Sequence, residues 1–175
     1  MAETLEKTEI MALGVVLERR RSHSPWQDWT WRPVAVIPGA PPVEGGWRLL
    51  REGDDWAHFH AATVPLELYR ADTDGYRLNL SQDPPRLWVA LRPDDTAEPG
   101  ALAPFFVTAS AHECEVYQVS GNETVETVPM PPEVLALVRD FVDQHHVDVP
   151  FEKRERKRHH PDGPRRPGPD RTRDP

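Results

Sequence analysis

Three of the six tryptophans of the chain lie in the segment Pro25-Trp26-Gln27-Asp28-Trp29-Thr30-Trp31-Arg32-Pro33. A buried tryptophan removes about 200 Å² of surface from water, so this segment is expected to anchor the core or to form a binding face. Trp29 and Trp31 alternate with Thr30, which would place both indoles on one face of an extended strand. We predict these two as core residues beneath a C-terminal helix, and Trp26 and Asp28 as exposed residues near the preceding turn.

Short segments of β-branched and aromatic residues surround this stretch, separated by turns rich in Gly, Pro and Asp. In residues 76–80, Tyr76, Leu78 and Leu80 alternate with polar residues, a pattern typical of a half-buried strand. The expected fold class is mainly β (α+β), a small antiparallel barrel or sandwich of about eight to ten short strands. The predicted strands are 13–17, 29–37 with an edge position or a bulge at Pro33, 47–51, 56–61, 66–70, 76–80, 87–91, 105–110, 113–119 and 125–128.

One C-terminal helix is expected to cover the β layer, at residues 132–145. Pro131, Pro132 and Glu133 suit a first helical turn. The apolar residues that follow recur at helical spacing: Val134, Leu135, Leu137, Val138, Phe141 and Val142. The expected organisation is a flexible leader at 1–10, a single domain at 11–150 and a disordered basic tail at 151–175.

Charge is unevenly divided along the chain. Residues 152–175 hold nine Lys/Arg and five Asp/Glu, a net charge of +4, and the whole chain carries −8, so residues 1–151 carry −12. An acidic body disfavours nucleic-acid binding, which requires a basic footprint. No apolar run near the start is long enough to span a membrane, and Glu3, Glu6 and Glu9 disfavour export.

Cys114 is the only cysteine. A single thiol excludes an internal disulfide, a cysteine-based zinc site and an iron–sulfur cluster made by this chain alone. A reducing, cytoplasmic setting is therefore expected. His112 lies two residues away and would share a strand face with Cys114, but no orienting group for a Cys–His nucleophile is evident. A small buried thiol is the simpler interpretation.

The histidines His58 and His60 are the weak candidates for metal ligands. In a strand they would point to the same side, and a third ligand would have to come from His112 or Glu113. The alternative is that both belong to a half-exposed polar strand face. The chain has no glycine-rich phosphate loop and no Gly-x-Ser-x-Gly motif. We therefore predict no resident cofactor and favour a non-enzymatic role.

A binding site for a ligand or partner is predicted at Arg19, Arg21, Trp26, Asp28 and Arg32. If the strands that carry these residues pair, guanidinium groups and indole faces would lie together. Such a surface can hold an anionic, planar or carboxylate group. The alternative is structural cation–π packing with ordinary surface salt bridges.

The segments 14–20, 25–28, 31–36, 78–81, 116–117 and 129–133 carry a family resemblance that covers roughly residues 11–158. In these segments the chain resembles an uncharacterised proteobacterial family. Its members resemble small proteins that are encoded beside the genes of molybdenum-dependent formate dehydrogenases and their chaperones, and some members carry the label molybdopterin-guanine dinucleotide biosynthesis protein A.

This resemblance implies a non-catalytic accessory factor that binds a protein partner or cofactor during assembly of a molybdenum-dependent formate dehydrogenase. The expected partner is the dehydrogenase or one of its maturation proteins, with no membrane. The alternatives are a molybdenum-cofactor maturation enzyme that handles a nucleotide, and a histidine-based metal-binding module. The missing phosphate loop disfavours the first alternative, and the single cysteine disfavours the second.

Overall fold

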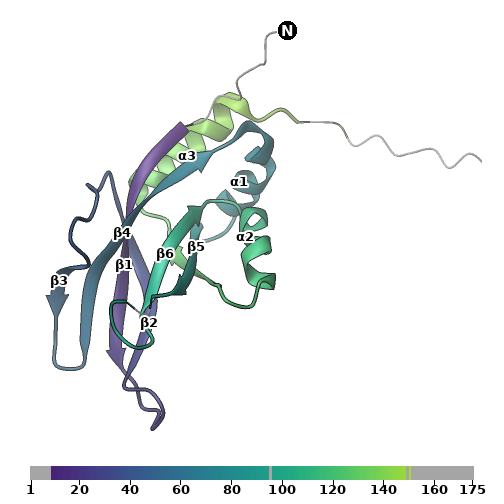
Figure 1. The fold of residues 1–175 in the computed structure, drawn as a ribbon. Helices are drawn as coiled ribbons and strands as arrows, with labels where there is room; N and C mark the ends of the chain where they lie inside the picture. Colours follow the sequence, from purple (N-terminus) through teal and green to yellow (C-terminus); the bar gives the residue numbers. More distant parts are fainter. Residues whose placement is uncertain (1–8, 95, 149, 151–175) are drawn as a thin grey trace, which may run out of the picture.

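A computed structural model describes residues 9–94, 96–148 and 150 (Figure 1). The predicted tail at 151–175 lies outside the described residues, as does the predicted leader except for its last two residues. Those two residues, Glu9 and Ile10, already belong to the first strand.

The fold is mainly β, as the sequence predicts, with three α-helices that include the C-terminal one. The described part has seven strands, fewer and longer than expected, because several predicted short strands are parts of longer ones. The strands are β1 (Glu9–Arg21), β2 (Trp29–Pro38), β3 (Arg48–Glu52), β4 (Trp56–Leu68), β5 (Arg86–Pro93), β6 (Leu102–Thr108) and β7 (Thr124–Pro129). The helices are η1 (Arg70–Asp72), α1 (Thr73–Leu80), α2 (Ala111–Val119) and α3 (Pro132–His145).

The strands form one sheet in the order β2-β1-β4-β6-β5-β7, and β3 pairs with the first half of β4. All pairs are antiparallel except β4 with β6, which run parallel and meet at Leu66 and Val107. The two outer strands, β2 and β7, approach each other, so the sheet curls into a nearly closed, barrel-like shape (Figure 1).

Helix α3 closes the core as its apolar stripe predicts. Val134, Val138 and Phe141 are buried together with the strand residues of the core. The ring of Phe141 meets that of Tyr76 from α1, with 6.1 Å between the centroids. The predicted helix thus has the bounds that its periodicity indicates.

The regular alternation of β1 decides which side chains face the core. Leu13, Val15 and Leu17 lie in the core, so the residues between them point to the outer face. The pairing of β1 with each neighbouring strand is interrupted by one bulge. In both cases the unpaired residue belongs to the neighbouring strand: residue 34 in β2 and residue 61 in β4. Because β1 itself stays regular, Arg19 continues the core face and Glu18 and Arg20 lie on the outer face.

Two predicted strands are helices. The segment 76–80 belongs to α1 and the segment 113–119 belongs to α2. In α1 the buried residues are Thr73, Tyr76 and Asn79, a spacing of three, whereas Leu78 is exposed. The alternation of apolar residues was therefore misleading, because the buried position belongs to the polar Asn79, which finds hydrogen-bond partners inside the fold.

Candidate functional site

An open cleft of about 760 Å³ lies at the end of the sheet where β1 and β2 meet. We call it the arginine–tryptophan cleft; Arg19, residues 26–29 and residues 98–100 line it. Arg19 comes from the core face of β1, and Trp29 begins β2. Residues 98–100 belong to the loop between β5 and β6, so segments about 80 residues apart in the chain form this cleft.

The guanidinium of Arg19 is stacked on aromatic rings. Its central carbon lies 4.5 Å from the ring centroid of Trp29 and 5.4 Å from that of Phe59. Its Nη1 donates to both carboxylate oxygens of Glu98, at 2.9 and 3.1 Å. Its Nε is buried without a hydrogen-bond partner within the described residues. Arg19 therefore ties the loop to the sheet and keeps one donor unsatisfied.

Trp31 belongs to an aromatic cluster under the cleft. It is buried, with its ring centroid 4.9 Å from that of Trp47 and 6.0 Å from that of Phe59. A neighbouring cavity of about 530 Å³ is lined by Trp47, Phe59 and Glu98, among others. The prediction that Trp31 is buried is confirmed, but its aromatic neighbours come from the β3 side of the sheet and not from α3. Trp29 is only half-buried.

The structure brings together three of the five predicted site residues. Arg19, Trp26 and Asp28 line the cleft, and 93% of the surface of Trp26 is exposed. Arg21 lies on the same face of β1, with its guanidinium carbon 5.6 Å from the Trp29 ring, but is not part of the lining. Arg32 lies on the opposite face of the sheet and is held by Glu18.

Sequence reasoning missed Glu98 and Gln27 in the cleft and Glu18 on the opposite face. Glu98 lies in a long acidic loop, and no pattern in the sequence pairs it with Arg19. Gln27 lies between Trp26 and Asp28, two residues that were predicted as part of the site, so its place in the cleft could have been predicted from the sequence.

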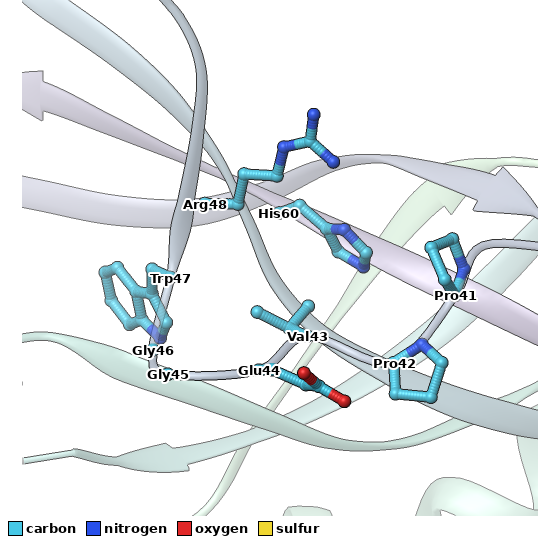
Figure 2. A pocket seen from close by; sticks show the side chains of 9 residues that line it. All are labelled: Pro41, Pro42, Val43, Glu44, Gly45, Gly46, Trp47, Arg48 and His60. Carbon is cyan, nitrogen blue, oxygen red and sulfur yellow. The ribbon is translucent and has the colours of Figure 1, made fainter.

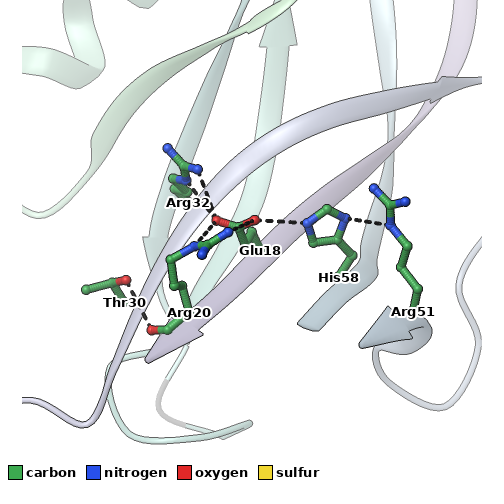
Figure 3. A network of polar contacts seen from close by, with 6 residues as sticks. All are labelled: Glu18, Arg20, Thr30, Arg32, Arg51 and His58. Atoms are coloured by element: carbon green, nitrogen blue, oxygen red, sulfur yellow. Dashed lines mark hydrogen bonds and ion pairs between the residues drawn. The ribbon is translucent and has the colours of Figure 1, made fainter. Parts of the chain in front are cut away.

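Glu18 organises a polar network on the outer face of the sheet (Figure 3). Only 6% of its side chain is exposed. It accepts hydrogen bonds from Arg20 at 3.0 and 3.2 Å and from Arg32 at 3.1 and 3.0 Å. Nε2 of His58 lies 3.0 Å from Oε2 of Glu18. The hydrogen bonds from Arg20, with those from His58 and Arg32, lower the pKa of Glu18 to about 2, against the opposing effect of burial.

The two candidate metal ligands have different partners. His58 is held by Glu18, whereas Nε2 of His60 lies 2.8 Å from the hydroxyl of Thr63. Burial lowers the pKa of His60, and the positive charge of Arg48 adds to this. Of the two residues named as a source of the third ligand, His112 is exposed on α2, and Glu113 lines a different cavity together with Glu67. Within residues 9–94 and 96–148, no three His, Cys, Asp or Glu side chains form a group that could hold a metal.

His60 instead borders a cavity of about 380 Å³ beneath the loop that joins β2 to β3 (Figure 2). The hydroxyl of Thr63 donates to the carbonyl of Pro41 at 2.6 Å, so His60 and Thr63 together hold this loop. A Cβ atom at Gly14 would lie 2.7 Å from Nε2 of His60. Glycine is therefore needed at this position for the imidazole to lie against β1.

Cys114 is buried in α2, and burial raises the pKa of its thiol to about 12. His112 is exposed on the same helix. The two residues were expected to share a strand face, but residues two apart in a helix point to nearly opposite sides. The structure therefore separates the two members of the candidate nucleophile pair.

A further cavity, of about 400 Å³, lies between β4, β6 and α2 and holds two carboxyl groups, Glu67 and Glu113. Burial raises the pKa of Glu113 to about 7, although the hydroxyl of Thr108 donates to its carboxylate. The neighbouring carboxyl groups of Asp72 and Glu67 raise this pKa further. Glu113 thus holds a proton in the folded state well above the pH at which an unfolded glutamate loses it.

Replacing Glu113 with glutamine is expected to stabilise the protein at pH 8 by about 1 to 2 kcal/mol. The folded-state pKa of Glu113 is raised, so the folded state binds more protons between pH 4.5 and 7, and its stability falls as the pH rises through that range. E113Q cannot lose this proton, so its advantage over the natural protein should be absent near pH 4 and full at pH 8. Urea unfolding at several pH values measures this. The same advantage in Glu115→Gln, an exposed residue of α2, would contradict the assignment to Glu113.

The fold and the cleft define the class of this protein: a mainly β domain whose barrel-like sheet carries an open arginine–tryptophan cleft at one end. The chain belongs to the family described as "Protein of unknown function (DUF3305)", whose model matches residues 12–156. No curated protein and no solved structure matches the chain. In the part of the chain that the structure describes, the helices are too short or too polar to cross a membrane.

Proposed function

We propose that the protein is a non-catalytic accessory factor that binds a segment of a protein partner in the arginine–tryptophan cleft. The observation that carries this proposal is Trp26, which is 93% exposed at the rim of the cleft. Burying an indole against a partner gains a large apolar area, and tryptophan and arginine dominate the binding energy of many interfaces. Trp26 and Arg19 line the same cleft.

The other groups of the cleft favour a polypeptide over a small ion. The charge of Arg19 is already balanced by Glu98, so a lone anion would have to compete with a carboxylate in place. The aromatic surface of Trp26 and Trp29 remains. It suits an aromatic or apolar side chain, as a peptide segment supplies.

The identity of the partner rests on the family resemblance. It implies a molybdenum-dependent formate dehydrogenase or one of its maturation proteins, and we propose that binding occurs in the cytoplasm during assembly of that enzyme. Binding of a nucleotide or of the molybdenum cofactor would instead support the maturation-enzyme alternative. A thermal shift of the purified full chain with GTP, CTP or molybdopterin distinguishes these outcomes.

Replacing Trp26 with alanine is expected to reduce the recovery of the partner at least tenfold, because a buried tryptophan contributes 2 kcal/mol or more at the centre of an interface. Tagged full-length protein would be used to capture partners from cells that produce the dehydrogenase. The unfolding midpoint should not change, since Trp26 is exposed. Val119→Ala, which shortens an exposed apolar residue of α2, is the matched control. Recovery of no dehydrogenase subunit or maturation protein, or equal recovery by W26A, would reject the proposal.

A further inference from the structure

The outer face of the sheet carries a second surface that is independent of the arginine–tryptophan cleft. Arg20 from β1, Arg32 from β2 and Arg51 from β3 lie there around the buried Glu18 (Figure 3). Arg19 points to the core face of the same strand, so the sheet itself separates this arginine face from the cleft. We define the arginine face as Arg20, Arg32 and Arg51 with His58 between them.

The arginine face carries an excess of positive charge. Arg20 and Arg32 share the single buried carboxylate of Glu18, and Arg51 donates to His58. The three guanidinium groups and the carboxylate together carry a net charge of about +2, before the acidic turn at 52–55 is counted. Arg51 Nε donates to Nδ1 of His58 at 3.4 Å, and Nε2 of His58 lies 3.0 Å from Glu18. The acidic turn at 52–55 bounds the face on one side.

Glu18 also fixes the guanidinium groups in position. Arg20 Nε and Arg32 Nη2 both donate to Oε1 of Glu18, each at 3.0 Å. The shared acceptor therefore holds the two guanidinium groups close to each other. Within the described residues, Nη1 of Arg20 and Nη1 of Arg32 have no acceptor. The side chains of Arg20 and Arg32 are 52% and 61% exposed. Because Glu18 already orders the guanidinium groups of Arg20 and Arg32, these side chains lose little conformational entropy when a ligand binds.

We propose that the arginine face is a docking surface for an acidic segment of a protein partner. Carboxylates of Asp and Glu match the guanidinium edge with paired hydrogen bonds. The charge of the rest of the molecule argues against a nucleic acid, because residues 1–151 carry −12 and would repel a long polyanion. A short acidic segment responds mainly to charges within about 10 Å, so the guanidinium groups that it contacts count for more than the distant acidic residues of the domain.

The test uses the full chain and a ten-residue peptide that alternates Glu and Ser, with a Gln-for-Glu peptide as the control ligand. The reporter is the indole N–H resonance of Trp56, assigned through Trp56→Phe. The Trp56 ring lies 4.8 Å from that of His58 and 5.5 Å from the guanidinium carbon of Arg51. The acidic peptide is expected to shift this resonance and the Gln peptide is not, and the affinity should fall as salt is added.

Arg51→Gln is the decisive variant, because Arg51 does not contact Glu18 directly and its loss leaves the bonds of Arg20 and Arg32 intact. Its dissociation constant for the peptide should rise about fivefold. Arg139→Gln removes the same charge from the exposed side of α3 and should leave the affinity unchanged. Basic residues at 153–158 are the same in both variants, so they cannot produce the difference.

Three results would overturn the inference: no shift of Trp56 with the acidic peptide, equal affinity of the R51Q and natural proteins, or tighter Arg51-dependent binding of a single-stranded oligonucleotide. The last result would assign the face to nucleic acid. None of them bears on the cleft, which is tested by the recovery of the partner with the natural and W26A proteins. Failure of this inference and failure of the proposed function are thus distinguishable.

Discussion

Replacing Glu18 with glutamine is expected to lower the free energy of unfolding by about 3 kcal/mol at pH 7. The carboxylate of Glu18 is nearly fully buried and accepts hydrogen bonds from two arginines and a histidine. Glutamine has the same shape, but its NH₂ group would face donors from Arg20 or His58 in place of an acceptor. Two donors that point at each other lose both the charge attraction and the hydrogen bond.

The effect of Glu18→Gln should depend on pH in a defined direction. The pKa of Glu18 is lowered to about 2 in the folded state, from 4.5. A lowered pKa contributes stability that is complete above the unfolded value and is lost as the pH falls through the folded value. The difference between the natural protein and E18Q should therefore be constant above pH 5 and shrink between pH 4.5 and 2. Urea unfolding measured from pH 7 down to pH 3 follows this change.

The control for this prediction is Glu98→Gln. Glu98 also binds an arginine, Arg19, but 43% of its side chain is exposed. Exposed ion pairs contribute about 1 kcal/mol or less, so E98Q should be close to the natural protein in stability. If E18Q lost less than about 1 kcal/mol, or if its loss were the same at pH 3 and pH 7, the network around Glu18 would not have the role assigned to it.

Replacing Asn79 with alanine is expected to cost about 3 kcal/mol of stability. The buried amide of Asn79 joins α1 to the first residue of β5 and to the residue after β6. Its Nδ2 donates to the carbonyl of Arg86 at 2.7 Å and to that of Ala109 at 2.8 Å. Its Oδ1 accepts from the backbone N–H of Arg86 at 3.0 Å. Alanine would remove the side-chain partner of three backbone groups, of which the carbonyl of Ala109 is bonded in a buried position.

Amide hydrogen exchange gives a second measurement for Asn79→Ala. The N–H of Arg86 should lose protection, because its acceptor is removed. Ser81→Ala is the control: the hydroxyl of Ser81 donates to Leu78 at 2.6 Å, but Ser81 is exposed, so its loss should cost well under 1 kcal/mol. An Asn79→Ala protein with natural stability and a protected Arg86 amide would show that the hydrogen bonds of the Asn79 side chain do not stabilise the fold.

Much of the fold could be predicted from residue patterns. The apolar stripe of residues 134–142 defines α3, and β-branched runs indicate β1, β2, β5 and β7. The patterns failed at α1 and α2, where short segments fit a period of two as well as a helical period. In α1 the decisive residue is Asn79, whose burial depends on carbonyl groups of β5 and of the residue after β6. A polar residue is predicted as exposed unless its partners are known.

The candidate site could be predicted only in part, for a related reason. The tryptophan segment pointed to Trp26 and Asp28 directly, and Arg19 followed from a neighbouring strand. The first strand was expected to end at Leu17, because a run of charged residues normally marks a surface. In the structure β1 continues to Arg21, so alternation sends Arg19 into the cleft and Arg20 to the arginine face.

Four features can be read from residue patterns alone: the mainly β class, the C-terminal helix, the unequal division of charge and the aromatic density near Trp26. Each of these follows from local composition or from periodicity, which act over a few residues. The positions of the charged side chains of β1, in contrast, depend on contacts between distant segments. Glu18 is buried because it is paired with Arg32, 14 residues away, and with His58, 40 residues away, and Arg19 is fixed by Glu98, 79 residues away. Burying a charge is costly unless its partners are brought to it, and the curled sheet brings them.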